Sequence, residues 1–221
     1  MKNNDYAALV RGGKEVIMRM VDAQYEARDE NGSGIITGRP VVFNSRTDLG
    51  FCDEVIAPEA LNKTDLRDVR LCLNHDTSYV YARSRQNNGN STMTVSTDAM
   101  GMTFEASLDI ENSPKARDYY AAVKRGDIDK MSFMFSVDAV EWENLESDHP
   151  TRRITSIGRI FEVSAVTFPA YEATSIEARS EETLESIREE LENARQLRLK
   201  TPDGDIELAK AKYFYTRRKS K

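Results

Sequence analysis

The chain has 221 residues, of which 31% are charged and 39% hydrophobic, and its formal net charge is −6. This length can bury one sizeable core, so we expect one large domain or one domain with an appendage. The negative charge argues against general nucleic-acid binding by the whole chain. No apolar run approaches the ~20 residues of a membrane span, and the N-terminal residues predict no signal peptide.

The chain holds two cysteines and two histidines. Cys52 and Cys72 lack the Cys-x-x-Cys spacing, and we expect both to be free thiols. The cysteines and histidines lie too far apart in the sequence for the usual zinc-ligand spacing. We therefore expect neither a metal site nor a cofactor.

Short strand-like segments dominate the first half of the chain. Residues 35–43 predict a strand or two with a bend at Gly-Arg-Pro, and a turn at 48–50 precedes a short strand at 51–56. Residues 59–67 are ambiguous and could form a short helix. In 69–75, Val69, Leu71, Leu73 and His75 share one parity, which predicts a half-buried strand whose last inward residue is His75.

The second half alternates strands with two helices. A hairpin signal lies at 87–91, and strands are predicted nearby at 92–95 and 101–108. Ser113 as N-cap, Pro114 at the first helical position and Gly126 as terminator predict a helix over 114–125. Strands follow at 131–142, 153–157 and 160–168, with a polar loop at 144–150. From Ser180 a 3/4 apolar spacing predicts an acidic amphipathic helix, which a polar, basic tail follows.

These elements favour the α+β class. We expect an antiparallel β-barrel or a strongly bent sheet with surrounding helices, plus the C-terminal helix. Residues 1–14 are predicted to be a flexible extension, 15–180 the main domain, and 181–221 a charged helix and basic tail.

Three residues could together carry acid–base and nucleophilic chemistry. His75 carries an imidazole, the side chain most suited to proton transfer at neutral pH; Ser132 offers a hydroxyl opposite large apolar neighbours, and Glu162 is a carboxylate within an apolar strand. Each also has a plain structural interpretation: a hydrogen-bonding histidine, a small polar strand residue, and a carboxylate that faces solvent or pairs with Arg153 or Arg159. No Gly-x-Ser-x-Gly elbow occurs, which excludes the α/β-hydrolase pattern.

Several short motifs resemble, in order and separation, those of the tailed-phage prohead (capsid-maturation) protease family. They are Asn74-His75-Asp76, the segment 130–135 around Met-Ser132-Phe, and the segment 161–171 that begins Phe-Glu162-Val-Ser164, together with matching pieces at 43–58, 101–105, 125–128 and 152–154. The resemblance covers roughly residues 15–180. These proteins are similar in fold to the herpesvirus assemblins, which are serine peptidases built on a β-barrel with helices around it.

The resemblance implies a serine endopeptidase with a Ser-His-acid triad. His75 matches the family's histidine, Ser132 its serine, and Glu162 is our choice for the acid, with Asp138 or Glu141 as alternatives. His149 is expected to be exposed in a polar loop, and Arg152 and Arg153 are candidates for the oxyanion site. The sequence departs from the family at Ala82-Arg83, where Gly-Arg is usual, and at Ser132-Phe-Met-Phe, where Ser-Phe-Gly-Phe is common.

The resemblance also implies partners and a location. The substrates would be the major capsid protein and a scaffold or scaffold-like segment, cleaved in the host cytoplasm inside the assembling procapsid, and the chain would also cleave itself. The tail after Ser180 could be a targeting or self-removed segment, or a solvated helix. Self-association stays open. The rivals are a non-enzymatic capsid-assembly or scaffold module with a structural His75, and a hydrolase that uses paired carboxylates.

Overall fold

A computed structural model describes residues 16–21, 25–30, 33–85, 90–167 and 181–199. The strands are β1 (Val16–Val21), β2 (Tyr25–Glu30), β3 (Ser33–Val42), β4 (Thr47–Asp48), β5 (Asp53–Ile56), β6 (Arg70–Leu73), β7 (Ala82–Arg83), β8 (Met93–Asp98), β9 (Gly101–Leu108), β10 (Lys130–Glu143) and β11 (Thr151–Val166). The helices are η2 (Pro58–Leu61, a 3₁₀ turn), α1 (Pro114–Arg125) and α2 (Glu181–Leu199).

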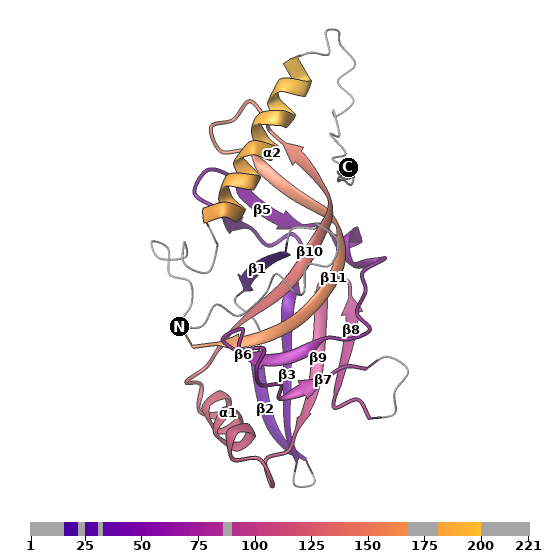
Figure 1. The fold of residues 1–221 in the computed structure, drawn as a ribbon, viewed down its shortest axis with the longest axis vertical. Coiled ribbons are helices and arrows are strands. Elements are labelled where there is room, and N and C mark those ends of the chain that lie inside the picture. Colours follow the sequence, from indigo (N-terminus) through magenta and orange to yellow (C-terminus); the bar gives the residue numbers. More distant parts are fainter. Residues whose placement is uncertain (1–15, 22–24, 31–32, 86–89, 168–180, 200–221) are drawn as a thin grey trace, which may run out of the picture.

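The long strands β10 and β11 form the spine of the larger sheet (Figure 1). They pair antiparallel, and β1 pairs antiparallel with the outer edge of β10. On its other edge β11 pairs in parallel with two short strands, β5 at its beginning and β6 near its end. A single strand of 16 residues therefore connects the two ends of the molecule.

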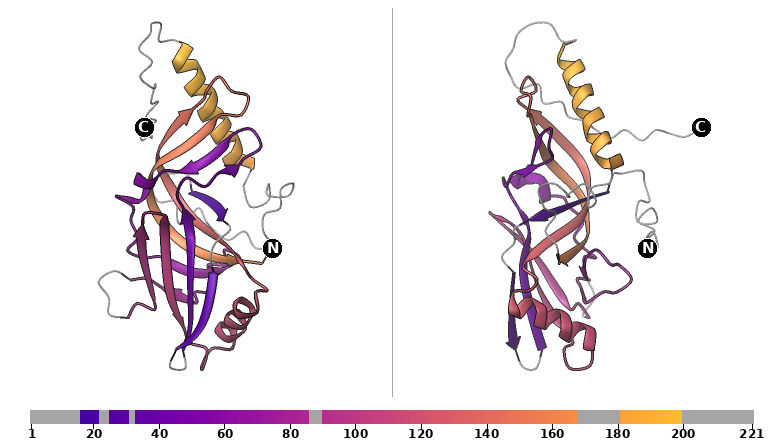
Figure 2. Two further views of the ribbon diagram at one scale, coloured as in Figure 1. Left: turned by 180° about the vertical axis from the view of Figure 1, so that it is seen from behind. Right: turned by 90° about the vertical axis from the view of Figure 1, so that its left-hand side faces the viewer.

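The smaller sheet has the order β2-β3-β9-β8 and is antiparallel throughout. Helix α1 packs at one end of the molecule and α2 at the other (Figures 1 and 2). Ser113 caps α1 by accepting the backbone N–H of Ala116, and Gly126 ends it in the left-handed conformation with φ 78°. The main apolar core contains residues of both sheets and of α1, including Phe104, Tyr119 and Phe133.

Helix α2 closes a second, smaller core. Its residues Ile187, Leu191 and Ala194 pack with Trp142 of β10, with Leu145 of the β10–β11 connection, and with Leu49 and Cys52. The apolar 3/4 spacing in this helix thus faces the body of the protein. Among the described helices, none is long and apolar enough to cross a membrane.

Much of the predicted secondary structure is confirmed. Strands lie at the predicted places in the segments 33–42, 53–56, 93–98, 101–108 and 130–143, and α1 has the predicted bounds and caps. The predicted amphipathic helix is α2. Residues 87–89 of the predicted hairpin, the predicted extension at 1–14, residues 168–180 and the predicted tail from residue 200 lie outside the described residues.

Other predictions need correction. The described strands form two sheets and close no barrel, and the larger sheet is not purely antiparallel, because β5 and β6 both pair in parallel with β11. The two strands predicted at 153–157 and 160–168 are one continuous strand. Strands β1 and β2 lie where no strand was predicted. The predicted strand at 69–75 ends at Leu73, so His75 lies in a turn.

Candidate active site

His75 is held in an unusual turn directly after β6. Asn74 and His75 both adopt left-handed backbone conformations, with φ 51° and 59°. Asparagine and histidine are among the residues that tolerate this region best. The backbone N–H of Asn74 donates to the carbonyl of Ala165 (2.8 Å), and its side-chain oxygen accepts the N–H of Thr167 (2.9 Å). The turn is thereby fastened to the end of β11.

Asp76 completes the Asn-His-Asp turn from the other side. Its Oδ1 accepts the backbone N–H of Ser78 (3.0 Å) and the Ser78 hydroxyl (2.5 Å). These hydrogen bonds, that to the Ser78 hydroxyl first, hold the pKa of Asp76 below its usual range. Asp76 therefore stabilises the turn as a local cap.

Glu162 meets the imidazole of His75. Its Oε1 lies 2.5 Å from His75 Nδ1, and the Glu162 side chain is 1% exposed against 14% for His75. A buried carboxylate needs hydrogen bonds or a charged partner, and this contact supplies one of them. An ionised carboxylate only accepts, so Nδ1 carries the proton and Nε2 is the basic nitrogen of neutral His75.

Ser132 lies on the same face of the sheet as Glu162. It pairs with Ser164 in the β10–β11 ladder, and Met134 pairs with Glu162. Residues directly opposite in an antiparallel pair share a face, and so do residues two apart in one strand. Ser132 is completely buried, and its hydroxyl donates to the backbone carbonyl of Arg19 on β1 (3.0 Å).

A buried chain of alternating charges continues from Arg19. Arg19 donates to both carboxylate oxygens of Glu54, through Nε to Oε1 and through Nη2 to Oε2 (2.8 Å). Glu54 also accepts from Arg152 (2.7 Å), and Arg152 binds Glu190 of α2 (3.0 Å). Trp142 Nε1 donates to the same Glu190 (2.7 Å). Hydrogen bonds and ion pairs thus connect the C-terminal helix to the strand that holds the Ser132 hydroxyl.

The two cysteines are free, as predicted, and the structure places both in buried positions. Burial, followed by the nearby Glu162 charge, raises the pKa of the Cys72 thiol to about 12. Burial, followed by the Glu54 charge, likewise raises that of Cys52 to about 12. The thiolate is the reactive form, so neither cysteine is suited to be a nucleophile at neutral pH.

These geometries can be compared with known proteins. A family model described as Caudovirus prohead serine protease matches residues 21–189. The chain belongs to this family. No curated protein and no solved structure matches the chain. The match encloses the Asn-His-Asp turn, Ser132 and Glu162, and it makes the chain a serine peptidase by family.

The alternative acids and the second histidine of this prohead protease lie elsewhere. Asp138 and Glu141 are half-buried on β10, and a side chain at Gly158 would collide with the carboxylate of Asp138. His149 is exposed, as expected, and its Nε2 lies 3.3 Å from Asp53. Of these acids, Glu162 has the described contact with His75.

The arginines considered for the oxyanion site lie at the wrong end of β11. Arg152 precedes Glu162 by ten positions on the strand, roughly 33 Å along it at about 3.3 Å per residue. It is fully buried against Glu54 and Glu190, and Arg153 contacts Asn44 (3.3 Å). The assignment of either arginine to the oxyanion site is therefore wrong on geometric grounds.

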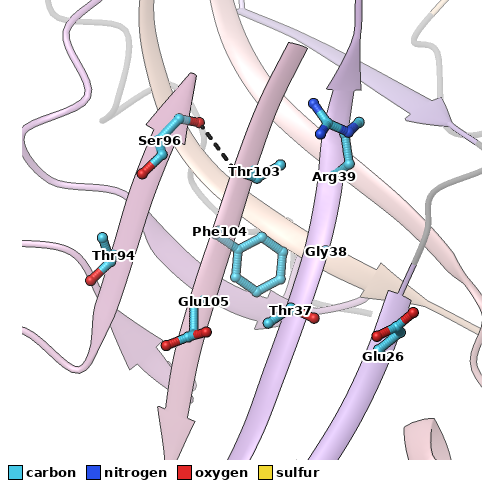
Figure 3. Close-up of a pocket in the computed structure, with 9 residues that line it drawn as sticks. All are labelled: Glu26, Thr37, Gly38, Arg39, Thr94, Ser96, Thr103, Phe104 and Glu105. Atoms are coloured by element: carbon cyan, nitrogen blue, oxygen red, sulfur yellow. Dashed lines mark hydrogen bonds between the residues drawn. The ribbon is translucent and has the colours of Figure 1, made fainter. Parts of the chain in front are cut away.

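The outer face of the smaller sheet carries a shallow hollow that is separate from these residues (Figure 3). Most of its lining residues have polar side chains, and they come from all four strands of that sheet: Glu26, Thr37, Gly38, Arg39, Thr94, Ser96, Thr103, Phe104 and Glu105. None of the predicted site residues lines it. The hollow gives no reason to move the candidate site away from β11.

Sequence reasoning missed two neighbours of the candidate triad. Ser164 bonds both Glu162 and the His75 backbone, and its position two residues after Glu162 could have indicated a shared strand face. Arg19 carries the acceptor of the Ser132 hydroxyl. No sequence pattern could have indicated that contact, because 113 residues separate the two.

Proposed function

We propose that this chain is a serine endopeptidase that cleaves the major capsid protein and scaffold or a scaffold-like segment during procapsid maturation, and that it also cleaves itself. The proposed roles are Ser132 as nucleophile, His75 as general base and Glu162 as the acid that orients the imidazole. The 2.5 Å contact between His75 Nδ1 and Glu162 Oε1 carries the proposal. It lies on the sheet face of Ser132, inside the family match.

The proposed reaction begins with a rotation of the Ser132 hydroxyl. Its hydrogen points to the Arg19 carbonyl and must turn to Nε2 of His75 before the base can remove it. Oγ then attacks the carbonyl carbon of the scissile peptide, and the resulting imidazolium is stabilised by Glu162. The C–N bond breaks as His75 returns the proton to the leaving amine. Water, activated by the same histidine, then hydrolyses the acyl-enzyme.

The buried state of Ser132 has a consequence for this reaction. A substrate carbonyl can reach Oγ only if the groups that cover the Ser132 side chain move, because the serine is fully buried. The ion pairs and hydrogen bonds that link Arg19, Glu54, Arg152 and Glu190 connect β1 to β5, β11 and α2. We infer that the free chain reacts slowly and that contact with the capsid protein favours access.

The test is co-expression with the cognate major capsid protein, read out by the intact masses of both chains. Wild-type protein should shorten the capsid protein and its own chain, whereas Ser132→Ala should leave both at full length. Ser136→Ala is the matched control, because Ser136 is also buried on β10. Full-length chains with the wild type, or normal processing with Ser132→Ala, would refute the peptidase and favour a non-enzymatic assembly module.

A further inference from the structure

Ser164 lies between the acid and the histidine of the candidate triad. It is completely buried on β11, opposite Ser132 on β10 and beside Cys72 on β6. Its hydroxyl donates to Glu162 Oε2 (2.5 Å) and accepts the backbone N–H of His75 (3.1 Å). A hydroxyl has one hydrogen and two lone pairs, so this polarity is fixed: the carboxylate can only accept, and the amide can only donate.

These hydrogen bonds fix the carboxylate of Glu162 at both oxygens. Oε1 meets His75 Nδ1, while Oε2 accepts from Ser164, so the carboxylate cannot rotate without losing a contact. Glu162 is 1% exposed, and water cannot readily replace a lost partner. An alanine at position 164 would leave a buried carboxylate oxygen without this donor.

The same hydroxyl also fixes the main chain of His75. The φ of 59° is a conformation that non-glycine residues seldom adopt, and surrounding contacts must hold it. The amides of Asn74 and His75 are successive anchors, the first on the carbonyl of Ala165 and the second on the hydroxyl of Ser164. Ser164 therefore fixes the backbone position from which the His75 side chain extends, and it also fixes the orientation of the Glu162 carboxylate.

We propose that Ser164 is a positioning residue for peptide hydrolysis, which aligns the His75–Glu162 pair with Ser132. This inference rests on the proposed function, because it assumes that Ser132 is the nucleophile. Ser164 touches no reacting atom and acts through Glu162 and His75. The loss of a hydrogen bond to a charged group predicts a rate decrease on the order of tenfold to a hundredfold.

The experiment compares substitutions that separate the hydroxyl from side-chain volume. Ser164→Thr keeps the hydroxyl, Ser164→Val has nearly the shape of threonine without it, and Ser164→Ala removes it without adding volume. The first readout is the rate at which a fluorophosphonate probe modifies Ser132 in the presence of the major capsid protein, because Ser132 is buried in the free chain; intact mass follows this modification. The second is the Nδ1–H resonance of His75 in histidine-labelled protein, assigned with His149→Gln because the chain has two histidines.

We expect Ser164→Ala and Ser164→Val to react on the order of tenfold to a hundredfold more slowly than wild type, and Ser164→Thr to react at least severalfold faster than Ser164→Val. The Nδ1–H resonance should persist with threonine and broaden or shift with alanine and valine. In a Glu162→Gln background, Ser164→Ala should slow the probe little further, because residues that act as a unit are not additive. Ser136→Ala should behave like wild type.

Three outcomes would overturn the proposal: equal rates for Ser164→Thr and Ser164→Val, an unchanged rate and resonance for Ser164→Ala, or an undiminished effect of Ser164→Ala in the Glu162→Gln background. The proposed function fails separately. If wild type and Ser132→Ala take up the probe equally, Ser132 is not the activated serine, whatever the resonance shows.

Discussion

Replacing Glu54 by glutamine tests the buried charge chain. Glu54 is 2% exposed, and its carboxylate accepts from Arg19 and Arg152. Burial raises the pKa of Glu54, but the two arginines outweigh burial and lower it from an ordinary 4.5 to about 2. At about 1.4 kcal/mol per pH unit, this lowering corresponds to about 3 kcal/mol in favour of the charged, folded form.

The expected cost of Glu54→Gln is at least as large as this value, because two buried arginines remain behind. Removing one partner of a buried ion pair costs about 3–5 kcal/mol. Arg152 retains Glu190, which favours the lower part of that range. Urea unfolding at pH 7 measures the loss, with Glu59→Gln as the matched control, because Glu59 is exposed on η2.

The same group predicts a dependence of stability on pH. A carboxyl whose pKa is lowered in the folded state stabilises the fold above its ordinary pKa, and the stabilisation is lost as the pH falls. The contribution of Glu54 should therefore disappear between about pH 4.5 and pH 2, and wild type and Glu54→Gln should converge there. A loss below about 1 kcal/mol at pH 7, or the same acid profile for both proteins, would refute the reasoning.

Three further predictions concern the stability and burial of the fold itself. Ser113→Ala should cost about 1 kcal/mol in urea unfolding, because the N-cap of α1 is lost; an unchanged midpoint would contradict it. Cys52 and Cys72, whose pKa values burial raises to about 12, should resist iodoacetamide at pH 8 in the native protein and react in urea, as mass spectrometry can show. Gly101→Ala should lower the free energy of unfolding in urea by at least about 2 kcal/mol. The φ of Gly101 is 149°, and a Cβ at this position would lie 1.9 Å from the Val41 carbonyl oxygen. A near-native unfolding midpoint would disprove this strain.

The chain of charged groups suggests how the C-terminal helix bears on the candidate site. Glu190 is beyond the family match, which ends at residue 189, yet it is buried against Arg152 and Trp142. The helix is therefore fastened to the body by a buried ion pair as well as by its apolar face. Loss of α2 would leave Arg152 with Glu54 as its described acidic partner and would weaken the hold on β1.

Local sequence signals were sufficient where the structure depends on near neighbours. Helix α1 begins at the serine cap and ends at the glycine that the sequence indicated, because capping involves residues three or four positions apart. Strands were likewise predicted at 101–108 and 131–142, although both faces of β10 are buried over 131–137. The candidate residues His75, Ser132 and Glu162 were selected by their side-chain chemistry and by the order of the motifs. Both can be recognised without knowledge of any tertiary contact.

The tertiary structure decided what depends on pairing between distant segments. Alternation placed His75 at the end of a strand, but its amide binds Ser164, 89 residues away, and this contact belongs to a turn with positive φ. Strands β5 and β6 pair in parallel with β11, and the described strands form two sheets in place of the expected barrel. Periodicity reports which face of a segment is buried, whereas the partner and the register arise from the packing of the whole chain. The sequence therefore determined the chemistry that is available, and only the fold decided which groups meet.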